Sequence, residues 1–102
     1  MVLFTFTSQG AAKTRPAIVL SSEAFHASRE DLIMMPLSTK PGGYFGDRRL
    51  LDWQGAGLPR PSNIKAVIQT IPRTAVSGKF GRLTMLDIQQ VKDALDDIIG
   101  VS

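Results

Sequence analysis

Few side chains in this sequence can do chemistry, and their types exclude several kinds of enzyme. The chain has no cysteine, which excludes a thiol nucleophile, a disulfide framework and a cysteine-ligated zinc site. His26 is its single histidine, so a multi-histidine metal site cannot form within one chain. The side chains left for chemistry are hydroxyl, carboxyl and basic groups. We expect no metal ion and no cofactor.

The basic residues are unevenly distributed along the chain. Residues 1–83 hold eleven lysines and arginines against five acidic residues, for a formal charge of +6, whereas residues 84–102 carry −3. A basic surface on a small domain attracts polyanions, most often nucleic acid. The alternative interpretation of the same charges is a solvated surface without any partner.

Length and hydropathy predict one packed domain over residues 1–102, since 43% of the residues are hydrophobic and 21% are charged. No run approaches the roughly 18 apolar residues that a membrane helix needs. The first ten residues, MVLFTFTSQG, contain no basic leader, so we expect no secretory signal. The prediction is a cytoplasmic protein that does not bind a membrane.

Alternating and β-branched runs must supply the scaffold, and they predict about six short strands. These include residues 2–7, 16–20, 31–37, 48–51 and 63–71. Segments rich in polar residues, glycine or proline predict loops or turns at 8–14, 38–46 and 72–81. Residues 24–29 fit a helical turn.

The C-terminal segment predicts an amphipathic helix. Thr84 suits the N-cap, Asp87 suits a weak capping box, and Gly100 suits the C′ position. An apolar stripe follows the helical period at Ile88, Val91, Leu95 and Ile98. The predicted fold is mainly β, a small SH3-like antiparallel β-barrel with a C-terminal α-helix packed on it.

Four separated segments carry a family resemblance. They are residues 13–21 (KTRPAIVLS), 35–39 (MPLST), 52–65 (DWQGAGLPRPSNIK) and 81–84 (GRLT). An Arg-Pro pair alone is a weak signal, but all four segments in order are a strong one. The chain resembles the MazF/PemK family of type II toxins over roughly residues 2–100. The resemblance implies a homodimer that cleaves single-stranded RNA, usually mRNA, without a metal ion.

The resemblance also implies the catalytic residues. Arg15 matches the family arginine that contacts the scissile phosphate, where a guanidinium stabilises the charge of the phosphorane. Ser38 stands where the family usually has threonine, and Thr39 follows it, so the catalytic hydroxyl belongs to Ser38 or, in reserve, to Thr39. His26 lies away from both segments, and we interpret it as a surface residue.

Further side chains are candidates for binding RNA, each with solvation of the surface as the alternative. They are Lys13, Lys40, Arg49, Trp53, Arg60, Lys65 and Gln69. An indole can stack on a base, but a small barrel equally needs a large side chain such as that of Trp53 to fill its core. Residues 65–70 lack the acidic residue that many relatives have near this position, which predicts altered base reading and not lost cleavage.

Two other functions stay open beside an endoribonuclease toxin neutralised by its cognate antitoxin. One is a gyrase-binding toxin of the CcdB type, which shares the fold and the dimer. The other is a non-catalytic RNA-binding barrel, if the exchange of threonine for serine abolishes activity.

Overall fold

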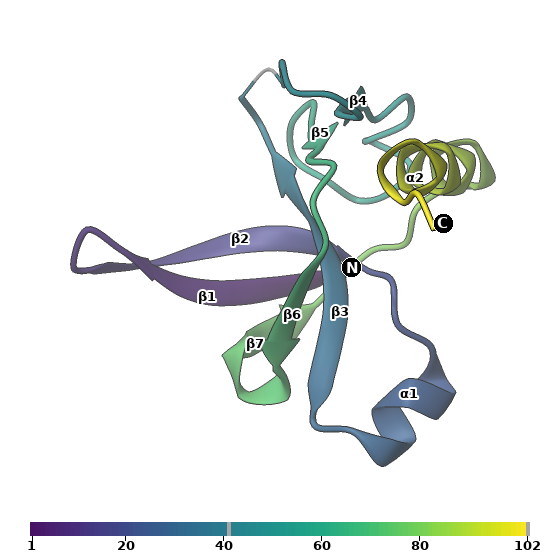
Figure 1. Cartoon of the computed structure of the whole chain (residues 1–102). Coiled ribbons are helices and arrows are strands. Elements are labelled where there is room, and N and C mark those ends of the chain that lie inside the picture. Colours follow the sequence, from purple (N-terminus) through teal and green to yellow (C-terminus); the bar gives the residue numbers. More distant parts are fainter. Residues whose placement is uncertain (41, 102) are drawn as a thin grey trace.

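The computed structural model describes residues 1–40 and 42–101 as a mostly antiparallel β-structure with a C-terminal helix (Figure 1). Its strands are β1 (Val2–Ser8), β2 (Ala11–Val19), β3 (Asp31–Ser38), β4 (Arg48–Arg49), β5 (Asn63–Ile64), β6 (Gln69–Pro72) and β7 (Val76–Lys79). Its helices are α1 (Glu23–Ser28), the 3₁₀ helix η1 (Arg73–Ala75) and α2 (Met85–Ile98). Within the described part of the chain, no helix is long and apolar enough to cross a bilayer.

The strands form a barrel-like ring. Backbone pairing runs in the order β4-β5-β3-β2-β1-β7, and β6 pairs with β3. The short helix η1 connects β6 directly to β7. This covalent connection completes the ring β7-β1-β2-β3-β6, since the described strands include no backbone ladder between β6 and β7. The predicted mainly β fold with a C-terminal helix is confirmed.

The predicted loop at 8–14 is wrong, because β1 and β2 form a hairpin with a two-residue turn. The ladder continues to Ser8 opposite Ala11, and Gln9 and Gly10 make the turn with φ of 53° and 78°. Two positive φ angles match the right-handed twist of the flanking strands. The hairpin projects from the body of the molecule (Figure 1), and Arg15 lies within β2 and not in a loop.

Two further predictions of local structure are corrected. The predicted strand at 63–71 is split into β5 and β6, with no strand at residues 65–68. The predicted turn at 72–81 contains η1 and the strand β7, which pairs with β1. Pairing with a distant strand is the tertiary effect that local composition does not encode.

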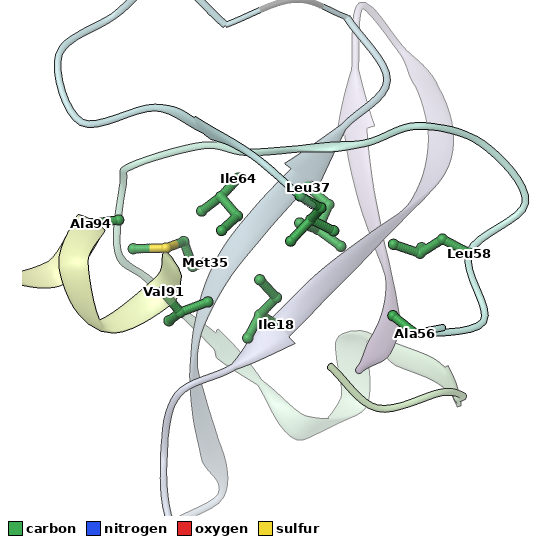
Figure 2. Packing of buried hydrophobic residues seen from close by; sticks show 9 residues of the cluster. Ile18, Met35, Leu37, Ala56, Leu58, Ile64, Val91 and Ala94 are labelled. Carbon is green, nitrogen blue, oxygen red and sulfur yellow. The ribbon is translucent and has the colours of Figure 1, made fainter. Parts of the chain in front are cut away.

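The central strand β3 is buried on both faces, because separate apolar clusters cover them. Met35 packs in a cluster with Ile18 of β2 and with Val91 and Ala94 of α2, as Figure 2 shows. Met34 packs on the other face, with Val2, Phe4 and Ala17. Alternation of side chains along a strand accounts for this division.

The start of α2 is fixed by a carboxylate that reaches across to another segment. Thr84 is the N-cap residue as predicted, but its side chain makes no capping hydrogen bond. The fully buried Asp87 carboxylate accepts hydrogen bonds from the backbone N–H of Leu51 at 2.7 Å and of Asp52 at 2.8 Å. The predicted capping box is therefore wrong, since Asp87 anchors the segment after β4 instead. Helix α2 ends at Ile98, with Ile99 as an extended C-cap and Gly100 at C′.

Candidate active site

Arg15 and Ser38 lie on the same face of the sheet because of the register between β2 and β3. The last paired residues of this ladder are Ala17 and Pro36. Two residues further along each strand stand Arg15 and Ser38, and a step of two residues returns to the same face. That face is the one on which Ala17 and Met34 pack, opposite the cluster that contacts α2.

A cavity of about 310 Å³ opens on this face. Four of the predicted site residues line it: Arg15, Ser38, Lys65 and Gln69. Its other walls are apolar and come from Phe4, Pro36, Leu37 and Val67. We did not predict these four as site residues, although the strand register places Phe4 opposite Arg15. The structure thus brings predicted site residues separated by up to 54 positions, from Arg15 to Gln69, around one small space.

Ser38 is the hydroxyl residue that lines this cavity. It is only 7% exposed, and its Oγ accepts a hydrogen bond from the backbone N–H of Lys40 at 3.1 Å. Thr39 is exposed and does not line the cavity. Since a hydroxyl carries one hydrogen and two lone pairs, the hydrogen of Ser38 stays available as a donor.

Lys65 lies in an irregular segment whose backbone is held by hydrogen bonds at three successive residues. The backbone N–H of Lys65 donates to the carbonyl of Pro36 at 2.9 Å, and that of Val67 donates to the carbonyl of Lys65 at 2.8 Å. Between them, the N–H of Ala66 donates to Oδ1 of Asp47 at 2.8 Å. These bonds replace a strand ladder and keep Lys65 and Val67 at the cavity wall.

The charge of the cavity favours an anionic ligand. Arg15 and Lys65 are its charged lining residues, and the described lining contains no carboxylate and no imidazole. A guanidinium matches the geometry of phosphate oxygens, and an ammonium adds a point charge. In residues 1–40 and 42–101, no group of three or more histidine, cysteine, aspartate or glutamate side chains is arranged to hold a metal ion.

The other predicted site residues lie outside the cavity lining. Lys13 and Lys40 are exposed, two residues along the chain from Arg15 and Ser38 respectively. Arg49 of β4 and Arg60 are exposed on other segments. Trp53 is half-buried and packs against the cluster of Ile18 and Met35, which is the core position that we named as its alternative.

A second cavity, of about 990 Å³, lies near α1 and contains none of the predicted site residues. His26 lines it, half-buried, with its Nε2 2.6 Å from Oγ of Ser21. Ser21 Oγ also accepts the backbone N–H of Ile33 at 3.0 Å. Arg73 donates to the carbonyl oxygens of His26 at 2.6 Å and Arg29 at 3.0 Å. Met1 and Arg82 also line this second cavity. Burial lowers the pKa of the Met1 α-amino group, and the Arg82 guanidinium lowers it further.

Comparison with solved structures finds the same fold in mycobacterial toxins. The Mycobacterium tuberculosis toxin MazF-mt6 superposes with a TM-score of 0.72 at 21% identity, covering 93% of this chain and 92% of that one. A second structure, described as an Mtb toxin, also gives 0.72 at 21% identity, covering 83% and 92%. An endoribonuclease in complex with its cognate antitoxin, from a mycobacterial species, gives 0.67 at 18% identity, covering 92% and 86%.

The sequence itself identifies the family. Among curated proteins, none matches this chain. Residues 1–99, however, match the family described as PemK-like, MazF-like toxin of type II toxin–antitoxin system. That match includes all four segments on which the resemblance was based. With a cavity that joins Arg15, Ser38 and Lys65, and with the fold of mycobacterial toxins, the chain belongs to the PemK-like, MazF-like toxins of type II toxin–antitoxin systems.

Proposed function

We propose that this toxin is a metal-independent endoribonuclease that cleaves single-stranded RNA, in particular mRNA, in the cytoplasm. The observation that carries the proposal is the cavity in which Arg15, Lys65 and the Ser38 hydroxyl meet without any carboxylate in the described lining. Such a site attracts a phosphate and offers no oxygen cluster to a metal ion. The description of structural relatives as endoribonucleases supports the same reaction.

In the proposed reaction, the 2′-oxygen of one ribose attacks the adjacent phosphorus, and the bond from phosphorus to the 5′-oxygen breaks. The products are a 2′,3′-cyclic phosphate and a 5′-hydroxyl. The Arg15 guanidinium donates to the oxygens of the phosphorane, and the Ser38 hydroxyl donates a further hydrogen bond. Water accepts the proton of the 2′-hydroxyl and supplies the proton of the leaving oxygen, since the described lining holds no imidazole or carboxylate.

The remaining basic residues bind the RNA backbone in this proposal. Lys65 contacts a phosphate beside the scissile one, and Gln69 offers an amide to a base or sugar in the cavity. Lys13 and Lys40 adjoin the cavity along the chain and extend the path. Arg49 and Arg60 serve more distant phosphates, whereas Trp53 contributes through its packing against the core.

A homodimer is part of the proposal, and one apolar region supports it. At Gly46 an added Cβ would lie 2.8 Å from both Ala66 and Ile98, so three separate segments meet there. Large apolar side chains next to this meeting point in sequence are exposed: Tyr44, Phe45, Val67, Ile68, Ile99 and Val101. Burying them against a second copy is favourable, and the protein should therefore be a dimer by light scattering at micromolar concentration.

The cognate antitoxin is the second proposed partner. A flexible acidic tail can place carboxylates near Arg15 and Lys65, where RNA phosphates would otherwise bind, and apolar anchors must offset its ordering entropy. Reversing the charges of Arg49 and Lys65 should weaken binding of both antitoxin and RNA. If antitoxin affinity stayed unchanged while RNA affinity fell, the two would not share this surface.

Incubation of the purified protein with a long single-stranded RNA in EDTA tests the proposed activity. We expect fragments with 2′,3′-cyclic phosphate ends. Fragments with 3′-hydroxyl ends, or cleavage that needs a divalent cation, would refute this mechanism. Binding of the RNA without cleavage would favour the non-catalytic RNA-binding barrel.

A further inference from the structure

Asn63 holds the turn that follows the Ser38 hydroxyl. In the ladder between β3 and β5, Asn63 is the direct partner of Ser38. Its side-chain amide reaches past Ser38 and donates from Nδ2 to the carbonyl oxygen of Lys40 at 2.8 Å. The backbone of Lys40 is thereby fixed from a neighbouring strand as well as by its own chain.

The fixed residue is the one that determines how Ser38 is oriented. The N–H of Lys40 donates to Ser38 Oγ at 3.1 Å, and among the described residues this is the hydrogen bond that the hydroxyl makes. Because the bond occupies one lone pair of Oγ, the hydroxyl hydrogen is directed away from Lys40. Without the bond, the hydroxyl could rotate between its staggered positions, and only some of them would present a hydrogen to the cavity.

We propose that Asn63 is a positioning residue for cleavage, which acts on the phosphate through Lys40 and Ser38. Asn63 does not line the cavity, so its contribution is indirect. The proposal rests on the proposed endoribonuclease activity and on the role of Ser38 as a hydrogen-bond donor. It predicts that Asn63 contributes to catalysis only while the Ser38 hydroxyl is present.

A double-mutant cycle tests this dependence. We expect Asn63→Ala to lower kcat about tenfold with KM changed by less than about twofold, because one oriented hydrogen bond is weakened in the transition state. In the Ser38→Ala background, the same change should lower kcat by less than about twofold, since the hydroxyl that Asn63 orients is absent. Asn63→Leu, which keeps the side-chain volume without the donor, provides a second variant if Asn63→Ala does not fold.

Gln90→Ala serves as the matched control. Gln90 also donates a side-chain hydrogen bond to a backbone carbonyl, from Nε2 to the carbonyl oxygen of Arg49 at 3.1 Å. Within the described residues it makes no hydrogen bond to Ser38 or Lys40. Its loss should lower thermal stability and leave kcat within about twofold of the wild type. Hydrogen exchange of the Lys40 amide should accelerate in Asn63→Ala and in Ser38→Ala, but not in Gln90→Ala.

The outcomes separate failure of this inference from failure of the proposed function. If the wild type does not cleave RNA, the proposed function is wrong. If the wild type cleaves RNA and Ser38→Ala is impaired, but Asn63→Ala is unimpaired or its effect is equally large in both backgrounds, then Asn63 does not act through Ser38. The same conclusion follows if Gln90→Ala and Asn63→Ala lower kcat alike.

Discussion

The two cavities described above differ in what their polar side chains already bind. In the larger cavity, near α1, the Ser21 hydroxyl contacts His26 and Ile33, and the Arg73 guanidinium donates to two carbonyl oxygens. In the smaller cavity, Ser38 receives one N–H and keeps its own hydrogen. The Lys65 ammonium makes no hydrogen bond or ion pair within the described residues.

This difference explains why the smaller cavity is the better candidate for catalysis. Polar groups that already satisfy one another stabilise the fold, and recruiting them for a ligand would break those bonds. The Ser38 hydroxyl and the Lys65 ammonium can donate to a ligand without breaking such bonds. Volume alone would favour the larger cavity, which holds about 990 Å³ against 310 Å³.

The largest expected effect is the loss of cleavage in Arg15→Ala. Removing one preorganised transition-state contact costs about 3–4 kcal/mol, so the rate of RNA cleavage should fall by two to three orders of magnitude or more. Arg82→Ala is the matched control, because Arg82 is an exposed arginine at the larger cavity. We expect it to cleave at nearly the wild-type rate. A loss of less than about fivefold in Arg15→Ala, with the fold intact by circular dichroism, would remove Arg15 from the mechanism.

Replacing one serine of each cavity, Ser38 or Ser21, with alanine should separate the effect on activity from the effect on stability. Ser38→Ala should lower kcat about tenfold or more, because a donor to the transition state is lost. Ser21→Ala should leave kcat unchanged but lower the melting temperature by about 5–10 °C, since the N–H of Ile33 loses its partner. Both quantities can be measured on the same samples. The reverse pattern would assign catalysis to the larger cavity.

A smaller effect is expected for Lys65→Gln. Loss of one phosphate contact should raise KM several-fold and reduce the slope of log affinity for single-stranded RNA against log salt concentration by about 0.7. Lys79→Gln, at the larger cavity, is the corresponding control and should leave that slope unchanged. Equal slopes for wild type and Lys65→Gln would show that Lys65 does not contact phosphate.

The smaller cavity also shows how far sequence reasoning extends. The segments that contain Arg15, Ser38 and Lys65 could be found from their resemblance to a known family, and the β-class and the C-terminal helix follow from hydrophobic periodicity. The sequence could not give the register, that is, which residues of neighbouring strands pair with each other. The position of Arg15 within β2 depends on a two-residue turn at Gln9 and Gly10. Both residues of this turn take a positive φ, although only one of them is a glycine.

Long-range hydrogen bonds account for the remaining errors. Asp87 has the spacing of a capping box, but two N–H groups after β4 provide better partners for its carboxylate. Residues 65–68 have the composition of a strand, yet their backbone follows an irregular path. The N–H of Lys65 donates to the carbonyl of Pro36, and that of Ala66 donates to the carboxylate of Asp47. In both cases the competing partner lies at least 19 positions away, beyond any local signal.

The smallest expected effect is that of His26→Gln on cleavage. His26 is the chain's single imidazole, and a histidine that acts as general base loses activity as it is protonated. Its ring instead contacts Ser21 at the larger cavity, and its backbone carbonyl receives Arg73. Glutamine keeps a polar group that can bond Ser21, so the fold should be retained.

We expect kcat of His26→Gln within about twofold of the wild type and a superimposable pH profile of kcat/KM. If His26→Gln removed a limb of that profile, the imidazole would take part in proton transfer. The assignment of proton transfer to water in the smaller cavity would then be wrong.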